Sequence, residues 1–192
     1  MNKLDRSLER AAEFIWRNAR LLERAMFARE FLDGSSGAVV NALVAYRNPD
    51  GGFGNALEPD VRAPGSMPLH CEQALRVLQE ADIRNLQLAS GAAEYLSSVA
   101  EPSARVEIVS AEFDHYPRAS HSSSSFGTDS PNPTAGLEGL LRFQTVEHPW
   151  LTRATWWCER RLKRPLADGT NCCAQSGSSN RRATERAHRK RR

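Results

Sequence analysis

The stretch from Tyr46 to Arg62, YRNPDGGFGNALEPDVR, constrains the fold more than any other part of the chain. Apolar residues at helical spacing run into it and resume soon after it, which predicts a connection between two helices. Pro49 biases Asn48 away from the helical region, and Gly51 and Gly52 accept backbone conformations that other residues disfavour. Phe53 adds one large apolar side chain that can pack between helix ends. We therefore predict an all-α protein organised around this loop.

Six helices are expected from the apolar spacing, paired as three hairpins. Their predicted ranges are 3–32, 37–47, 67–81 after a cap at Ser66, 84–99, 133–147 after a cap at Asn132, and 151–162 after a turn at 148–150. Ser35 or Ser36 is the expected cap of the second helix. In the first helix Phe14, Trp16 and Phe27 widen the apolar stripe, which predicts burial on more than one side. Residues 101–132 lack a helical pattern, and 106–109 is predicted to be a short extended piece.

The charge of the chain divides it into two regions. Residues 159–192 carry 11 Lys or Arg and 3 Asp or Glu, a net charge of +8, whereas the rest carries −5. After Pro165 apolar residues nearly vanish, so this segment cannot bury enough apolar surface to offset its ordering entropy. We predict a helical domain over 1–164 and a disordered basic tail over 165–192.

The cysteine pattern and hydropathy bear on compartment and cofactors. Cys71, Cys158, Cys172 and Cys173 show no zinc-site spacing, and no metal or other cofactor is expected. No stretch is long and apolar enough for a membrane span, and the N-terminus is charged rather than signal-like. A reduced cytoplasmic protein is the expected class.

The loop residues carry a resemblance. Asn48–Phe53 resembles the Gln-x-x-Asp-Gly-Gly-aromatic element of the terpenoid cyclase and protein prenyltransferase α/α-toroid superfamily. Ala45–Asp60 is similar, more narrowly, to uncharacterised bacterial prenyltransferase or squalene-oxidase repeat proteins, with Arg47 in place of glutamine. Asn132–Leu137 and His148–Leu151 match as well, so the resemblance covers roughly residues 14–163.

The resemblance implies a partial toroid of paired inner and outer helices, with a largely structural Gly-Gly-aromatic loop. It also implies an apolar, isoprenoid-like ligand between inner helices. The Asp-x-Asp-Asp and Asp-Asp-x-x-Asp signatures of the superfamily's chemistry are absent, so an enzymatic role stays open. The alternatives are a catalytically silent helical-repeat scaffold, a truncated fragment, or a basic-tailed nucleic-acid binder. In the last case binding through the run Arg186–Arg192 would be non-specific.

Two acidic positions in the central stretch are the candidate catalytic residues. Glu58 and Asp60 flank a proline, and mutual burial would raise one carboxyl pKa, as a general acid requires. The alternative is a solvated pair bound to Arg62 or Arg47. Asp50 is a ligand, an acid or, more in keeping with a Pro-Asp-Gly-Gly turn, a cap on its own backbone.

Other residues carry weaker hypotheses. His70 and Cys71 have metal-capable donors, but adjacent helical residues point in different directions. His115 and His121 are acid–base candidates whose ordinary state is a solvated imidazole. A larger aromatic set either lines an apolar cavity or forms ordinary core: Tyr116, Phe143, Trp150, Trp156 and Trp157. Aromatics in the first and sixth helices also predict self-association through open helical edges.

Overall fold

The computed structural model describes residues 3–110, 113–120, 122 and 130–162, with side chains from residue 6 onward. Residues Met1–Arg161 group into one compact unit, which is the subject below. The predicted tail over 165–192 lies outside the described residues.

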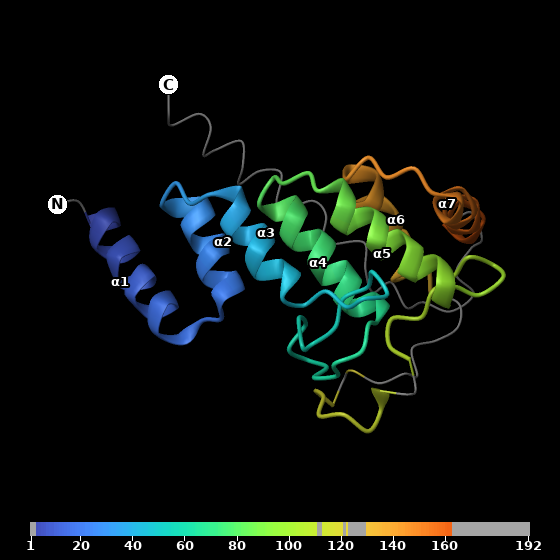
Figure 1. The fold of residues 1–192 in the computed structure, drawn as a ribbon, viewed down its shortest axis with the longest axis horizontal. Helices are drawn as coiled ribbons and strands as arrows, with labels where there is room; N and C mark the ends of the chain where they lie inside the picture. Colours follow the sequence, from blue (N-terminus) through green and yellow to red (C-terminus); the bar gives the residue numbers. More distant parts are fainter. Residues whose placement is uncertain (1–2, 111–112, 121, 123–129, 163–192) are drawn as a thin grey trace. The chain divides into compact units, whose positions relative to one another are not determined.

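The described part of the chain is all-α, as predicted, with seven helices and no named strand (Figure 1). The helices are α1 Lys3–Asn18, α2 Leu21–Phe31, α3 Ser36–Val44, α4 Pro68–Glu80, α5 Leu86–Val99, α6 Thr134–Phe143 and α7 Pro149–Leu162. Extended pairing in this part is limited to isolated bridges, Arg47 with Phe53 and Val61 with Arg118. The short extended piece predicted over 106–109 therefore forms no strand.

The single helix predicted over 3–32 is wrong, because the chain breaks between α1 and α2. Arg20 is extended there, with φ −68° and ψ 167°. Its guanidinium donates to the carbonyl oxygens of Ala56 and Leu57, at 2.9 and 3.2 Å. These partners lie 36 and 37 residues further along the chain, so helical periodicity carries no sign of the break.

The predicted burial of the first helix on more than one side is also wrong. Phe14 is 64% exposed and Trp16 is 46% exposed. No described side chain of α1 is buried, and α1 packs mainly against α2. Trp16 meets Phe27 edge-on, with ring centroids 6.1 Å apart. Apolar spacing thus predicts that the residues of α1 are helical, but not how much of the α1 surface other helices cover.

The starts of α3 and α4 differ in how well local sequence predicts them. Ser35 caps α3 as expected, since its hydroxyl accepts the N–H of Ala38. Pro68 lies in the first turn of α4, also as expected. The cap of α4 is Met67 rather than Ser66, and no side chain caps that end. The hydroxyl of Ser66 is used instead in the loop described below.

The fifth predicted helix begins one residue later than expected. Pro133 precedes α6 as its cap, without a side-chain hydrogen bond, and the helix starts at Thr134. The Thr134 hydroxyl accepts the N–H of Val106 at 3.0 Å. This hydrogen bond joins the irregular segment after α5 to the first residue of α6.

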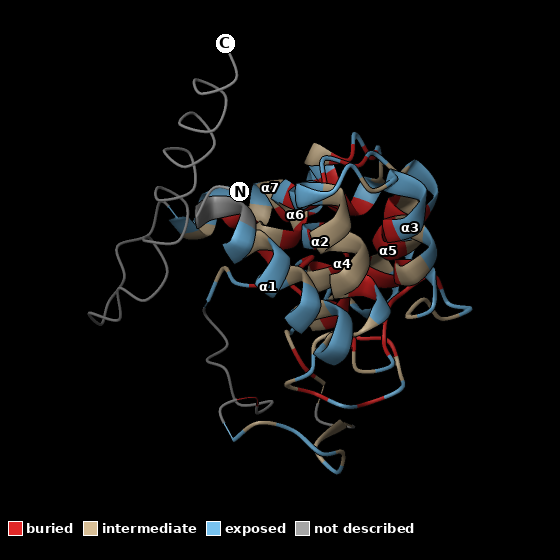
Figure 2. Ribbon diagram, turned by 90° about the vertical axis from the view of Figure 1, so that its left-hand side faces the viewer, coloured by how far each residue is buried: buried red, intermediate tan, exposed pale blue. Residues whose placement is uncertain are grey.

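The core lies among α4, α5 and α6, with contributions from α2, α3 and α7 (Figure 2). Its most completely buried large side chains are Leu22, Leu43, Phe53, Leu57, Leu75, Leu78, Leu96, Leu137, Leu141 and Trp150. A smaller apolar cluster of Val61, Ala63, Met67 and Val109 underlies the segment after the glycine-rich loop. Among the described residues no helix is both long and apolar enough to cross a membrane.

Candidate functional site

The loop from Asn48 to Phe53 closes on itself through its backbone. The N–H of Gly51 donates to the Asn48 carbonyl at 3.1 Å, and the N–H of Asn48 donates to the Gly52 carbonyl at 2.9 Å. The Asp50 carboxylate accepts the N–H of Gly52 at 2.9 Å and the hydroxyl of Ser66 at 2.8 Å. Asp50 therefore caps its own turn and binds that turn to the residue two positions before α4.

A small set of side chains, which we call the loop clasp, joins this turn to two helices. It consists of Asn48, Asp50, Ser66 and Tyr95. The Asn48 amide donates to Ser66 Oγ at 2.9 Å, and the Tyr95 hydroxyl, from α5, donates to the Ser66 carbonyl at 2.6 Å. The sequence pattern pointed to a different role for Ser66 and to none for Tyr95, since no local signal marks contacts 16 to 29 residues apart.

The two glycines of the turn are required for different reasons. Gly51 has φ +87°, in the left-handed region, and a Cβ there would lie 2.7 Å from the Gly91 carbonyl oxygen. A Cβ on Gly52 would lie 2.7 Å from both the Ser66 side chain and the Tyr95 ring. The turn therefore sits against α5 with no room for larger residues.

Arg47 stands where the resembled element has glutamine. Its side chain lies beside α5, with one terminal nitrogen 2.9 Å from the place of a Cβ on Gly91. Its Nε is buried, and no described residue accepts a hydrogen bond from that atom. Arg47 therefore packs against the turn without taking part in the loop clasp.

The backbone carrying Glu58 and Asp60 is held from several sides. Arg20 binds the two preceding carbonyls, as described above. The N–H of Glu58 donates to Nδ1 of His70 at 3.1 Å, and the N–H of Ala119 donates to the Asp60 carbonyl at 2.8 Å. One Glu58 carboxylate oxygen lies 3.5 Å from the N–H of Asp60. Glu58 and Asp60 therefore lie, each half-buried, on one turn whose backbone is fixed by these hydrogen bonds. We call residues 58–60 the acidic turn.

The charged groups around Arg20 reflect this arrangement. Its pKa is raised above the ordinary value, first by the hydrogen bond to Glu23, and the negative charge of Glu58 adds to the rise. The guanidinium also lies over the Tyr46 ring, 5.6 Å from its centroid. Arg20 thus connects the start of α2 to the acidic turn, a role that its place within an apparent helix concealed.

His70, in the first turn of α4, is fully buried. Burial lowers the pKa of its imidazole from 6.5 to about 4. The ring is therefore neutral near pH 7, and because Nδ1 accepts a hydrogen bond, Nε2 carries the proton. Among the described residues Nε2 has no hydrogen-bond partner. This histidine supports the acidic turn through an uncharged ring.

The buried imidazole predicts a pH dependence of stability. Above pH 6.5 His70 is neutral in both states; below it the unfolded chain binds a proton that the folded chain excludes until about pH 4. The free energy of unfolding should therefore decrease as the pH is lowered through this window, by at most about 1.4 kcal/mol per pH unit from this group. Urea unfolding at pH 7, 6 and 5 measures it. His70→Asn, which keeps an acceptor, should flatten the slope, whereas the control His115→Asn should not. If the unfolding free energies of the wild type and His70→Asn depended on pH in the same way, His70 would not be the buried, neutral group responsible.

Cys71 is also fully buried and follows His70 directly. Burial raises the pKa of its thiol to about 12, so the thiol stays protonated near neutral pH. Metal binding requires the thiolate. In the described residues no group of three or more His, Cys, Asp or Glu side chains gathers with metal-binding geometry.

The aromatic residues singled out by sequence lie in separate environments. Trp150 is fully buried, and its indole N–H donates to the Ala104 carbonyl at 3.0 Å. Trp156 is exposed. The Phe143 ring lies beneath the Arg84 guanidinium, 3.6 Å from its centroid. None of the five aromatic candidates lines the hollow between α6 and α7 that is described below.

The two remaining histidine candidates differ in what can be said of them. His115 is exposed, and its ring lies against Tyr116 in a tilted arrangement with centroids 4.2 Å apart. His121 lies outside the described residues. Neither is placed beside the acidic turn by a described contact.

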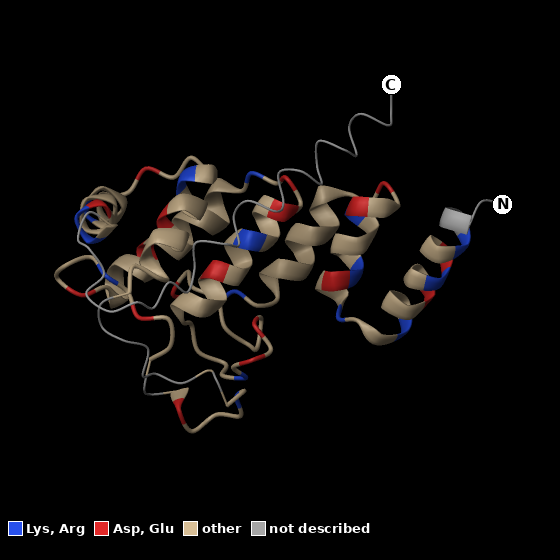
Figure 3. Ribbon diagram, turned by 180° about the vertical axis from the view of Figure 1, so that it is seen from behind, with Lys and Arg blue, Asp and Glu red and all other residues tan. Residues whose placement is uncertain are grey.

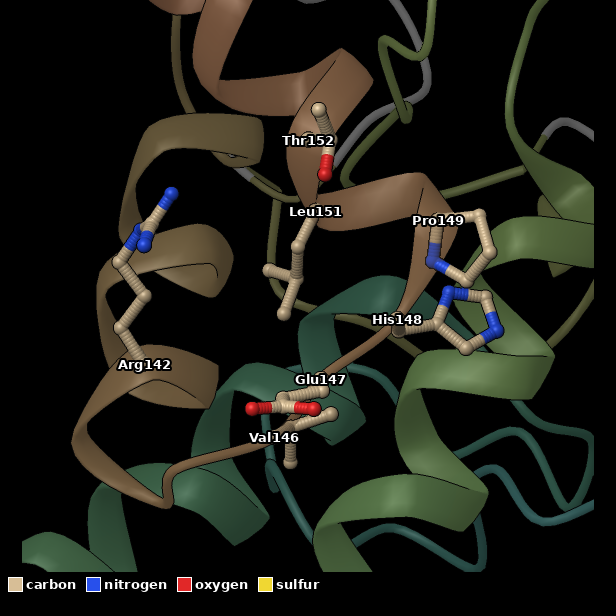
Figure 4. A pocket seen from close by; sticks show the side chains of 7 residues that line it. All are labelled: Arg142, Val146, Glu147, His148, Pro149, Leu151 and Thr152. Carbon is tan, nitrogen blue, oxygen red and sulfur yellow. The ribbon is translucent and has the colours of Figure 1, made fainter.

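A hollow of about 490 Å³ lies between the end of α6 and the start of α7 (Figure 4). It is lined by Arg142, Val146, Glu147, His148, Pro149, Leu151 and Thr152. Nδ1 of His148 accepts the N–H of Trp150 at 3.1 Å, and Nε2 lies 3.4 Å from the Glu94 carboxylate. Arg142 pairs with Glu138 and donates to Thr155 Oγ1. Arg142 and His148 thus contact carboxylates, Glu138 and Glu94, that do not line the hollow.

Among these regions, the loop clasp has the densest side-chain bonding, and the acidic role of Glu58 and Asp60 stays a prediction. Comparisons with protein-family models, curated proteins and solved structures find no match.

Proposed function

We propose that this chain is a helical-repeat scaffold of the prenyltransferase and terpenoid-cyclase toroid type. The observation that carries the proposal is the loop clasp. Asn48 and Asp50 hold the chain after α3, Ser66 leads into α4, and Tyr95 comes from α5. In this role the Gly-Gly-aromatic loop fastens successive helix hairpins together.

The packing of the helices supports a repeat arrangement. Besides its contacts with α5, α4 packs closely against α6, the second helix after it. In a toroid of helix hairpins, each inner helix lies beside the inner helix of the next hairpin. The α4–α6 contact is what such an arrangement predicts for two inner helices, and α5 would then be the outer helix.

Binding of an apolar, isoprenoid-like ligand is the second candidate function. It draws on the same α4–α6 arrangement, since such a ligand would lie against inner helices. The filled core argues for the scaffold instead: Leu75, Leu96 and Leu137 are fully buried against neighbouring protein. In this proposal the half-buried Glu58 and Asp60 have no catalytic role, and general-acid chemistry at either residue stays a prediction.

A double-mutant cycle tests the clasp. Asp50→Ala and Ser66→Ala each remove one end of a 2.8 Å hydrogen bond, so their effects on unfolding free energy should not add. We expect a coupling energy of about 0.5–3 kcal/mol, as for residues in one hydrogen-bond network. The pair Ser36→Ala and Asp50→Ala is the additive control. Additivity in both cycles would mean that the clasp does not hold the loop.

Thermal unfolding with farnesol, and with farnesyl diphosphate plus Mg²⁺, separates the two candidate functions. A ligand at 100 times its dissociation constant stabilises the folded state by about 2.7 kcal/mol. The scaffold proposal predicts no saturable rise in melting temperature. A saturable rise would replace it with the ligand-binding function.

A further inference from the structure

Residues Glu101–Val106, which follow α5, repeat the hydrogen bonding of the turn Asn48–Phe53, which follows α3. We call them the second turn and the first turn. In each turn the first N–H donates to the fifth carbonyl, and the fourth N–H donates to the first carbonyl. In the second turn these bonds join Glu101 to Arg105 at 2.9 Å and Ala104 to Glu101 at 2.8 Å. Each residue of the second turn thus corresponds to the residue 53 positions earlier.

The residues at the second and third positions of the two turns also correspond. Both turns have proline second, Pro49 and Pro102, and proline favours extended backbone in the residue before it. The third side chain caps its own turn: Ser103 Oγ accepts the N–H of Arg105 at 3.3 Å, as the Asp50 carboxylate does for the fifth residue of the first turn. The correspondence therefore includes side-chain bonds as well as backbone bonds.

The fourth and sixth positions share backbone conformation and burial. Ala104 has φ +73°, in the left-handed region that Gly51 occupies with φ +87°. Phe53 and Val106, the sixth residues, are 0% and 1% exposed, and both belong to the main core cluster. Each turn therefore ends by placing one apolar side chain in the core.

Both turns bond to the start of the helix that follows. The carbonyl of Phe53 accepts the N–H of Met67, the cap of α4. The N–H of Val106 donates to Oγ1 of Thr134, the first residue of α6. The sixth residue of each turn thus holds the next hairpin at its first helix.

An aromatic side chain from the second helix of the next hairpin bonds the backbone beside each turn. For the first turn it is Tyr95 of α5, which donates to the Ser66 carbonyl. For the second turn it is Trp150 of α7, whose indole N–H donates to the carbonyl of Ala104 at 3.0 Å. Both donors are buried, so each bond is shielded from water.

The hairpins that follow the two turns, α4–α5 and α6–α7, are also built alike. Their first helices are each followed by a left-handed residue, Asp82 with φ 52° and Thr145 with φ 59°. The next N–H, of Ile83 or Val146, donates to the carbonyl five residues earlier, at 2.8 and 3.1 Å. This is one type of helix end used twice. Two successive units, each of one turn and one hairpin, are therefore equivalent.

We propose that the second turn, with Thr134 and Trp150, is a second clasp that fastens the α4–α5 hairpin to the α6–α7 hairpin. The loop clasp fastens α2–α3 to α4–α5 in the same way. The inference rests on the proposed scaffold function and extends it, because it assigns a second fastening site and gives Trp150 the part that Tyr95 has in the first.

The second clasp differs from the first in holding charge. Arg105 stands where the first turn has Gly52, and its side chain, 9% exposed, pairs with Glu101 and Glu107. These charges come from the turn and the residue after it, since α3 carries no charged residue and α5 carries one, Glu94 (Figure 3). A Gly-Gly pattern in the sequence therefore does not find this turn.

Hydrogen exchange in the full chain, measured on peptides covering 48–54 and 101–107, tests the second clasp. Trp150→Phe removes the indole N–H but keeps an aromatic ring. Thr134→Val removes the acceptor of the Val106 N–H but keeps the shape of the side chain. Each variant should speed exchange over 101–107 relative to 48–54 by about two- to tenfold, the effect of losing one hydrogen bond.

Tyr95→Phe, which removes only the hydroxyl bonded to Ser66, is the matched control. It should speed exchange over 48–54 and leave 101–107 unchanged. Unchanged exchange over 101–107 in either Trp150→Phe or Thr134→Val would overturn the second clasp. Equal acceleration over both peptides would overturn it too, because these side chains would then support the core as a whole. A lack of response over 48–54 to Tyr95→Phe would count against the scaffold proposal instead.

Discussion

Phe53→Ala should lower the free energy of unfolding by about 3–5 kcal/mol, the range for removing a fully buried aromatic ring. Phe53 is 0% exposed and belongs to the main core cluster. Its carbonyl also accepts the N–H of Met67 at 3.1 Å, so the loop and the start of α4 meet at this residue. Removing the ring leaves a cavity where the loop joins the core.

Urea unfolding of Phe53→Ala beside Phe31→Ala measures this effect. Phe31 is 56% exposed, so its truncation should cost less than about 1 kcal/mol. Similar losses in the two variants would mean that Phe53 is not packed as described.

Gly51→Ala should destabilise the fold by about 2–4 kcal/mol, the combined cost of a strained backbone and an overpacked contact. The backbone at Gly51 has φ +87°, which an L side chain rarely adopts. The added methyl would meet the Gly91 carbonyl oxygen at 2.7 Å, and backbone atoms cannot swing aside. The turn would have to move away from α5 and lengthen the Tyr95 hydrogen bond to Ser66.

Gly139→Ala is the control for the same chemical change. Gly139 lies inside α6, and nothing approaches the place of its Cβ within 4 Å. Alanine there should stabilise the protein by about 0.5–1 kcal/mol through helix propensity. Opposite signs for the two variants are expected in thermal or urea unfolding. A neutral result at Gly51 would show that its turn is not held against α5.

Helices were predictable from sequence wherever the apolar spacing matches the side that is buried and the capping residues act within a few positions. The ranges of α4 and α5 lie close to those expected from apolar spacing, because both helices bury one continuous side. Ser35 was predictable as a cap because its bond to Ala38 spans three residues. The Asp50 turn is also local, with a bond to the residue two positions on.

The errors occur where distant residues override a local pattern. Apolar spacing continues through Arg20, yet bonds to carbonyls 36 and 37 residues away hold that residue extended. The aromatic residues of α1 read as core, but exposure depends on whether another helix covers them, and α2 covers only part of α1. Ser66 was expected to cap α4, but its hydroxyl is already used by Asp50 and Asn48.

The sequence by itself determined that this chain is helical and that a glycine-rich turn interrupts the helices after Tyr46. These features depend on backbone sterics and hydrogen bonds within a few residues. Only the tertiary structure decided that Arg20 ends one helix and begins another, that Ser66 and Tyr95 complete the clasp, and that His70 lies uncharged beneath the acidic turn. Those outcomes depend on which distant groups share one desolvated volume, and apolar periodicity carries no information about such pairings.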